Sequence, residues 1–182
     1  MFKISPGSPA YYLTSVTKDR LPVFRSDKIK AVTALALDEA RNSCGFLIFA
    51  YVIMPDHIHL ITDSHRKPEE ILRYVNGIVA RRVIDFLKKN NYVSSLEKLR
   101  HQDRGQGYRY SLWDHHPNIR QLTSESMLMQ RVRYTHQNPV RARLVENAED
   151  YEYSSVRLWN RRPREDEPLL VDIDKIHWRK GI

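Results

Sequence analysis

Hydrophobic and polar residues follow two periods in the first part of the chain, and each period predicts a kind of secondary structure. Residues 11–17 are rich in aromatic and β-branched side chains and follow Pro9, which is typical of a strand. Apolar positions then recur at helical spacing from Ser26, a residue type that favours the helix N-cap, and Gly45 provides a stop. We therefore expect a strand followed by a helix over residues 26–44.

The next apolar segment predicts a hairpin. Residues 46–54 are almost wholly apolar, as in a strand that is covered on both faces. The dipeptide Pro55-Asp56 then turns the chain, and a second strand-like run follows directly at residues 57–62. Because this connection is too short for a crossover, the two strands should pair antiparallel.

The remaining pattern predicts two further helices. The first has an apolar stripe that begins at Pro68 and ends near Asn90. The second spans residues 124–138 and ends before the proline that follows, because the residue before a proline is pushed away from helical geometry. Between them, residues 92–107 contain few apolar groups and are expected to form a mobile connection, with a short strand at residues 108–113.

The order of these elements predicts the fold class. Strand, helix, strand, strand, helix, strand is the order of the split β-α-β arrangement. We expect an α+β fold with a ferredoxin-like antiparallel β-sheet, helices packed on one face and a final helix near the C-terminal end. Apolar periodicity disappears near residues 161–168, where charge density rises. This divides the chain into a domain at residues 1–160 and a charged linker with a C-terminal tail at residues 161–182.

Charge is unevenly distributed along the chain, which indicates a partner. The chain has 30 Lys and Arg against 22 Asp and Glu, a formal net charge of +8. Residues 73–143 carry 14 basic and 5 acidic side chains, whereas the segments before and after are nearly balanced. A concentrated positive segment attracts a polyanion through counterion release, and 10 tyrosines, 5 phenylalanines and 3 tryptophans offer surfaces for stacking bases. Nucleic acid is the expected partner, and a solubilising basic surface is the alternative.

Composition also argues against several classes of protein. No run of about 18 or more uncharged apolar residues is present for a membrane span, and the first residues lack the pattern of a signal peptide. Cys44 is the single cysteine, so an intrachain disulfide is excluded and a buried thiol is expected. A Gly-rich phosphate loop is also missing, so no nucleotide cofactor is expected. We expect a cytoplasmic protein without a membrane partner.

Two histidines on one predicted strand are the first candidates for chemistry. His57 and His59 are two apart, so on a strand their side chains point to the same face, about 6.6 Å apart along it. Two imidazoles in this arrangement can converge on one metal ion. The pair alone also permits a simpler interpretation, in which one histidine pairs with a neighbour and the other is solvated.

A tyrosine and an asparagine on the predicted C-terminal helix are the second candidates. Tyr134 and Asn138 are four apart, which places them on one helix face about 5 to 6 Å apart. A tyrosine hydroxyl has an ordinary pKa near about 10, so attack on a phosphate at neutral pH needs help, most simply from a cation that polarises the phosphoryl oxygen. Asn138 can complete the shell of that cation. Without other context, Tyr134 is a packing residue and Asn138 is a helix C-cap.

Taken together, these segments resemble one family. The sequences YVIMPDHIHL at residues 51–60 and YTHQNPVRA at residues 134–142 are similar to REP-associated tyrosine transposases. These enzymes belong to the single-tyrosine branch of the superfamily named for its His-hydrophobic-His motif. Shorter similar segments extend the resemblance over roughly residues 8–160 and are found at residues 12–14, 112–114 and 153–155.

The resemblance implies a role for each candidate. His57, His59 and Asn138 would bind one divalent ion, Mg²⁺ or Mn²⁺, and Tyr134 would be the nucleophile. The family fold is a ferredoxin-like sheet with helices, which agrees with the order of elements. Asp56 stands where many relatives have asparagine, and it either adds an outer-shell hydrogen bond to one histidine or caps the turn.

By the same resemblance, the protein would cut and rejoin DNA by transesterification. Tyr134 would attack a phosphate in single-stranded or hairpin DNA, giving a 5′-phosphotyrosine link and a free 3′-hydroxyl. Because the bond energy stays in the covalent link, ATP is not needed. The expected phosphate contacts are arginines of the basic middle segment, namely Arg81, Arg82, Arg120, Arg131, Arg133, Arg141 and Arg143.

Other functions fit parts of the sequence. The main alternative is a domesticated sequence-specific DNA-binding protein without strand-transfer activity. A histidine-triad nucleotide hydrolase would need a third alternating histidine, but that position is Ile61. A replication initiator or relaxase often has a three-histidine site, and this chain is short for that class. The sequence leaves both a homodimer and a monomer open.

Overall fold

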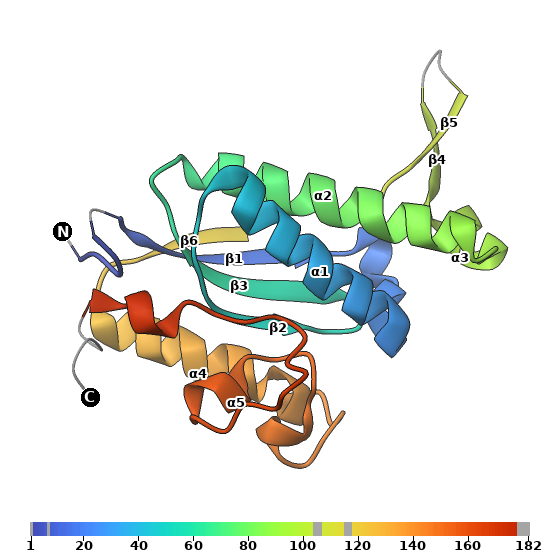
Figure 1. Cartoon of the computed structure of the whole chain (residues 1–182). Helices are drawn as coiled ribbons and strands as arrows, with labels where there is room; N and C mark the ends of the chain where they lie inside the picture. Colours follow the sequence, from blue (N-terminus) through green and yellow to red (C-terminus); the bar gives the residue numbers. More distant parts are fainter. Residues whose placement is uncertain (1, 7, 104–106, 115–117, 178–182) are drawn as a thin grey trace.

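A four-stranded antiparallel sheet forms the centre of the protein. The computed structural model describes residues 2–6, 8–103, 107–114 and 118–177. The strands lie in the order β2-β3-β1-β6 (Figure 1), with bounds Ala10–Val16 for β1, Ile48–Ile53 for β2, His57–Asp63 for β3 and Asn118–Leu122 for β6. The main helices are α1 (Asp27–Cys44), α2 (Pro68–Lys89) and α4 (Glu125–Arg141). With α1 between β1 and β2 and α2 between β3 and β6, the predicted ferredoxin-like α+β fold is confirmed.

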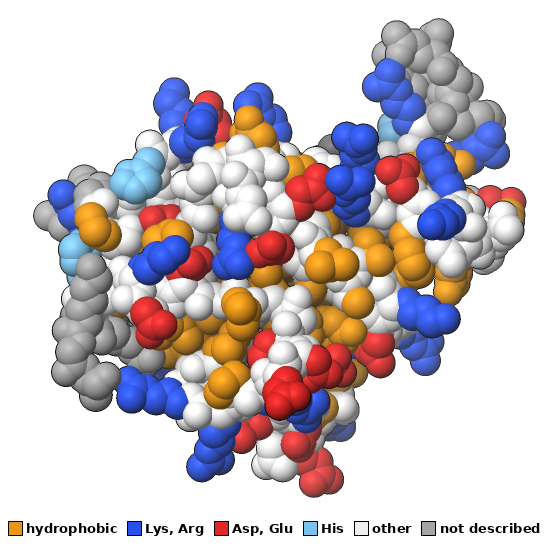
Figure 2. Space-filling view, in the orientation of Figure 1, with side chains coloured by type: hydrophobic (Ala, Val, Ile, Leu, Met, Phe, Trp, Pro, Cys, Tyr) orange, Lys and Arg blue, Asp and Glu red, His pale blue; other side chains and the backbone are white. Residues whose placement is uncertain are grey.

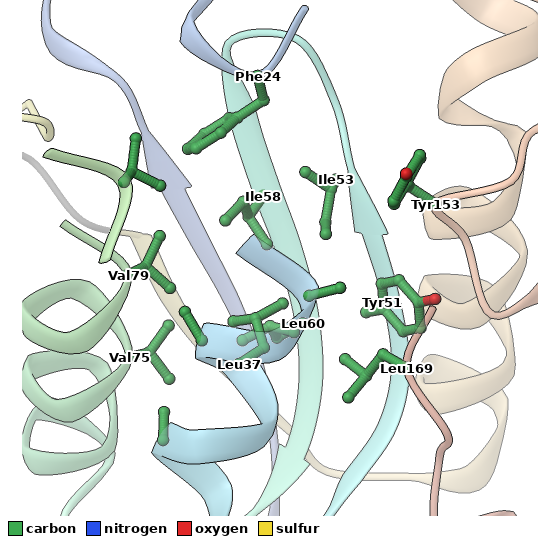
Figure 3. Packing of buried hydrophobic residues seen from close by; sticks show 14 of the residues in the cluster. Phe24, Leu37, Tyr51, Ile53, Ile58, Leu60, Val75, Val79, Tyr153 and Leu169 are labelled. Carbon is green, nitrogen blue, oxygen red and sulfur yellow. The ribbon is translucent and has the colours of Figure 1, made fainter. Parts of the chain in front are cut away.

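Helices α1 and α2 pack side by side on one face of the sheet, as expected (Figure 1). The Ser26 side chain caps α1 by accepting a hydrogen bond from the Ile29 amide, and Gly45 ends the helix with a left-handed φ of 73°. Leu37 of α1 and Val75 of α2 point into the same apolar cluster as residues of β3 (Figure 3). This face is therefore closed by a continuous hydrophobic core, which also buries Cys44, Ile58, Leu60 and Val79.

Helix α4 covers part of the opposite face. Leu128 and Val132 of α4 pack against Tyr12 of β1 and Ile61 of β3 in a second apolar cluster. Side chains alternate along a strand, so Tyr12 faces α4 whereas its neighbour Leu13 joins the α1–α2 core. The sheet is thus a middle layer between two unequal helical layers, and the predicted C-terminal helix forms the second of them together with Trp159 of the short helix that follows it.

The C-terminal end of α4 corrects one prediction. The helix continues past Pro139 to Arg141 instead of ending at Asn138. A proline inside a helix lacks the N–H that would bond the carbonyl of residue i−4, here Thr135. Because Pro139 lies in the last turn, only one such bond is lost, and the Ala142 and Leu144 amides still bond back to Asn138 and Pro139 carbonyls. Asn138 is therefore a helical residue and not the cap.

The segment between α2 and β6 corrects another prediction. Residues that were expected to form a mobile connection form α3 (Val93–Leu99) and the first strand of a hairpin, β4 (Arg100–Asp103) with β5 (Gly107–Tyr110). This hairpin projects from the body (Figure 1). The expected strand at residues 108–113 thus lies in the hairpin, and β6 is the fourth strand of the main sheet. Strand β6 is an edge strand in which only Leu122 is buried, so it lacks an apolar alternation.

Part of the described segment after residue 160 lies against the domain, although residues 161–166 are exposed. Arg157 of α5 (Val156–Trp159) pairs with Glu167 at 2.8 Å, with side chains only 5% and 1% exposed. Further along, Asp172 accepts a hydrogen bond from the Ile48 amide at 3.1 Å. Charge density along the sequence does not show such contacts, because the partners lie outside the charged segment, at Arg157 and Ile48. The division into residues 1–160 and 161–182 stays a prediction.

The surface agrees with the uneven charge of the sequence. Lys and Arg side chains line the upper edge of the molecule over α2, whereas Asp and Glu side chains gather near α5 (Figure 2). Among the described residues, no helix is both long enough and apolar enough to cross a membrane.

Candidate active site

The two histidines of β3 lie together on the side of the sheet that faces α4. Residues of β3 alternate, so Ile58 and Leu60 join the α1–α2 core while His57 and His59 point the other way. Their ring centroids are 4.7 Å apart, with an angle of 70° between the ring planes. The predicted geometry of a His-x-His pair is therefore present.

His59 is buried and held by two hydroxyl groups. Thr14 of β1 is its cross-strand neighbour, and Thr14 Oγ1 lies 2.9 Å from His59 Nδ1. Tyr12 Oη lies 2.8 Å from the same nitrogen, and the Tyr12 ring stacks on the imidazole at 5.2 Å and 24°. Burial first, and then the neighbouring His57 and Arg131, lower the pKa of His59 to about 3. His59 is thus neutral at neutral pH, which is the form that binds a metal.

His57 is held by a carboxylate. Its Nδ1 donates to Oδ1 of Asp56 at 2.6 Å, and Oδ2 of Asp56 accepts from Arg20 Nη1 at 3.0 Å. Burial alone would raise the pKa of Asp56, but the hydrogen bonds and charges of His57 and Arg20 outweigh it and lower that pKa below its usual value. Asp56 therefore stays ionised and orients the His57 ring, as expected for an outer-shell partner.

Helix α4 brings Tyr134 and Asn138 to the two histidines. The Tyr134 ring centroid lies 5.8 Å from that of His59, at an angle of 66°. Asn138 donates through Nδ2 to the Tyr134 carbonyl at 2.7 Å, and a hydrogen bond between Asn138 and His59 raises the pKa of that histidine against the larger effect of burial. Four residues that the sequence singled out from two distant segments are thus neighbours in space.

Three of the seven predicted arginines lie around this cluster. The guanidinium carbons of Arg131 and Arg141 lie 5.6 and 5.0 Å from the centre of the Tyr134 ring. Arg120 of β6 is the exposed cross-strand neighbour of Tyr12, so it lies on the same face of the sheet. Positive charge therefore surrounds the tyrosine on the open side of the cluster.

The other four arginines lie elsewhere. Arg81 and Arg82 belong to α2, on the opposite side of the sheet, and Arg82 forms two hydrogen bonds of 2.7 Å with Glu39 of α1. Arg133 lies along α4 beside a separate cavity of about 650 Å³, and Arg143 follows the helix end with a left-handed φ of 56°. The count of basic residues predicted the charge of the segment but not the face on which each arginine lies.

The donor atoms of the cluster fit a divalent cation. Both Nδ1 atoms are engaged, by hydroxyl groups at His59 and by Asp56 at His57, so Nε2 is the nitrogen of each ring that would bind an ion; at His59 the ion would compete with the hydrogen bond to Asn138. The amide oxygen of Asn138 adds a third donor on the same side. The described residues contain no group of three His, Cys, Asp or Glu side chains arranged to bind a metal.

Sequence reasoning missed Tyr12, Thr14 and Arg20 as parts of the site. Tyr12 and Thr14 have the two-residue spacing of one strand face, which is a visible signal. That signal does not tell which face they share with the histidines, since this depends on the register of β1 against β3. Arg20 lies in the short helix η1 (Lys18–Arg20) and reaches Asp56 across the end of the sheet, so it has no local signal.

Comparisons with known proteins agree with the fold. The family model of IS200-like transposases matches residues 8–101, which include both histidines but end before α4. A solved structure of a REP-associated tyrosine transposase bound to a REP hairpin is similar over 95% of this chain and 90% of that chain, with a TM-score of 0.62 and 14% identity. A candidate transposase from Deinococcus radiodurans R1 is 22% identical over 70% of this chain and 88% of its own, with a TM-score of 0.48. No curated protein matches the sequence.

Proposed function

The chain belongs to the family of IS200-like transposases, and from this premise we propose that it is a metal-dependent enzyme that nicks and transfers single-stranded or hairpin DNA. One observation above all supports this proposal. Tyr134 and Asn138 of α4 lie beside His57 and His59 of β3, with ring distances of 4.7 Å between the histidines and 5.8 Å from Tyr134 to His59. A nucleophile and a set of metal donors therefore share one place.

Tyr134 is the nucleophile of the proposed reaction. Its Oη forms a bond to the phosphorus atom of a DNA phosphodiester, the bond from phosphorus to the 3′-oxygen breaks, and the phenolic proton is lost as the 3′-oxygen gains one. The products are a 5′-phosphotyrosine and a free 3′-hydroxyl, and a 3′-hydroxyl of another strand reverses the step and releases Tyr134. The number of phosphodiester-type bonds is unchanged, so the reaction needs no ATP.

His57, His59 and Asn138 hold the metal ion in this proposal. A bound Mg²⁺ or Mn²⁺ would polarise the phosphoryl oxygen as a Lewis acid. The protein contributes fixed ligands, because Asp56 holds the ring of one histidine and β1 holds the other. Preorganised ligands avoid reorganisation when the substrate arrives.

Arg131 and Arg141 support both the nucleophile and the substrate. Their guanidinium groups lie near the Tyr134 ring, where positive charge favours the negative charge that develops on Oη during attack. The same charges attract the phosphates on either side of the scissile bond. The similar REP-associated transposase is bound to a REP hairpin in its structure, which supports a DNA hairpin as the partner of this chain.

A covalent adduct tests the proposal directly. The purified chain is incubated with Mn²⁺ and a single-stranded DNA hairpin labelled at its 3′ end, and the products are separated by denaturing electrophoresis. We expect a labelled protein adduct in the parent and in the control Tyr11→Phe, and none in Tyr134→Phe or with EDTA. An undiminished adduct in Tyr134→Phe would show that the nucleophile is another residue. Hairpin binding by the parent without any adduct would favour the domesticated DNA-binding protein instead.

A further inference from the structure

We propose that Tyr12 and Thr14 are positioning residues that fix the ring orientation and the tautomer of His59. In this tautomer, Nδ1 carries the proton and donates it to a hydroxyl oxygen of β1, and Nε2 keeps its lone pair for an ion, which would compete with the hydrogen bond between Asn138 and His59. The inference rests on the proposed function only in taking His59 as a metal ligand.

The register of β1 against β3 creates this arrangement. Thr14 pairs directly with His59, and Tyr12 pairs with Ile61, one step along the same face. Residues two apart on a strand share a face, so both hydroxyl groups reach the imidazole from neighbouring positions. The distances of 2.9 Å from Thr14 and 2.8 Å from Tyr12 end at the same atom, Nδ1 of His59.

Hydroxyl groups suit the position beside His59 because it is shielded from water. Tyr12 is 5% exposed and His59 is 6% exposed, so water cannot readily replace a lost hydrogen bond. A hydroxyl oxygen can accept the Nδ1 proton and remains neutral, whereas a carboxylate would bring a charge that is costly to bury. The stacked Tyr12 ring also limits rotation of the imidazole about its side-chain bonds.

His57 shows the alternative solution in the same strand. Its cross-strand partner is Val16, which has no hydrogen-bonding group, and its Nδ1 turns instead to Asp56 next to it in sequence. Asp56 can remain charged there because Arg20 neutralises it at the edge of the sheet. Both histidines thus have Nδ1 engaged by a partner, but the partners differ. At His57 the partner is a carboxylate, and at the buried His59 the partners are hydroxyl groups.

The tautomer is the first test, and it needs no metal. The full chain is labelled with ¹⁵N-histidine, and long-range ¹H–¹⁵N spectra at neutral pH distinguish protonated Nδ1 from protonated Nε2. His59 is assigned by the loss of its signals in His59→Ala. We expect the Nδ1-protonated form for His59. The Nε2-protonated form as the main species would overturn the inference.

Metal affinity is the second test. Mn²⁺ binding is measured by electron paramagnetic resonance of the free ion in the parent, Tyr12→Phe, Thr14→Val, the double variant and the control Tyr11→Phe. Because either hydroxyl can accept the proton, we expect a loss of a few-fold in each single variant and roughly 10-fold to 100-fold in the double variant. Tyr11→Phe loses a hydroxyl on the opposite face of β1 and should bind as the parent does.

The outcomes separate this inference from the proposed function. If the parent binds Mn²⁺ and His59→Ala does not, the metal site stands, and parent-like affinity in the double variant then overturns the positioning role alone. If His59→Ala binds Mn²⁺ as well as the parent, the metal assignment itself is wrong and the inference falls with it. Thermal unfolding of each variant without metal is the control, since a merely structural role would change the melting temperature and leave the affinity of the folded protein intact.

Discussion

The two faces of the central sheet share the same strands but differ in what closes them. Helices α1 and α2 bury one face in a continuous apolar core, whereas α4 covers the other face with apolar contacts at one end and polar side chains at the other. Strand β3 contributes to both, with Leu60 on the first face and His59 on the second. Alternation along one strand therefore separates residues of the apolar core from residues of the candidate site.

Two residues of β3, one from each face, allow the largest test of this separation. Leu60→Ala removes a buried side chain from the α1–α2 core and should lower the free energy of unfolding by about 2–5 kcal/mol. His57→Ala should change it by less than about 1 kcal/mol, which is usual for a residue outside a core. Urea denaturation measures both values.

The adduct assay completes this test at a temperature where both variants are folded. Leu60→Ala should still form the tyrosine adduct with DNA, whereas His57→Ala should lose it almost entirely because a metal donor is gone. If His57→Ala keeps full adduct formation, the α4 side of the sheet is not a metal site. If Leu60→Ala unfolds no more easily than His57→Ala, the two faces do not differ in the way described.

Acid should weaken the α4 side of the molecule. His59 and His136 are both buried there, whereas the described part of the α1–α2 core contains no buried histidine. Burial lowers the pKa of His136 from 6.5 to about 4, so between these values the unfolded chain binds a proton that the fold excludes. Stability should thus fall as the pH falls from about 6.5 to about 4, with a slope of up to about 1.4 kcal/mol per pH unit from this group.

Comparison with a variant isolates the contribution of His136. In His136→Gln, the slope of unfolding free energy against pH should be smaller than in the parent over this range, while the part due to His59 remains. Urea denaturation in a series of buffers gives the slopes, and the exposed residue His65, changed to Gln, is the control. Equal slopes in the parent and His136→Gln would contradict the prediction.

The smallest expected effect is on DNA affinity, when one arginine from each side of the sheet is replaced. Arg131→Ala should weaken binding of single-stranded DNA by about 3-fold to 10-fold and reduce the salt slope by about 1, because Arg131 lies beside Tyr134. Arg82→Ala should change the affinity by less than about 2-fold, since Arg82 pairs with Glu39 on the other side. Fluorescence anisotropy at several salt concentrations measures both. Equal losses would place DNA on both faces.

Local signals predicted the elements that depend on local physics. Ser26 and Gly45 bound α1 as expected because capping and a left-handed turn need only neighbouring residues. The hairpin of β2 and β3 followed from its short turn. Strand β6 was missed because its pairing with β1, and not an apolar pattern, makes it a strand.

The candidate site was predictable only where its spacing is local. The pairs His57 with His59 and Tyr134 with Asn138 each follow from the period of one element, and the family resemblance joined them. The roles of Tyr12 and Thr14 depend on strand register, which shifts every side chain to the other face if it slips by one residue. Register is set by the whole sheet, so no short segment reveals it.

The buried pair between Arg157 and Glu167 has a consequence for how the chain is made. Arg157 leaves the ribosome before Glu167, which follows ten residues later and supplies the carboxylate at 2.8 Å. A guanidinium that is buried without its carboxylate would cost about 3–5 kcal/mol, so α5 packs stably beside β2 only after Glu167 has been synthesised. Packing of α5 beside β2 is therefore a late step in the order in which the chain emerges, because both histidines and Tyr134 are synthesised before Glu167.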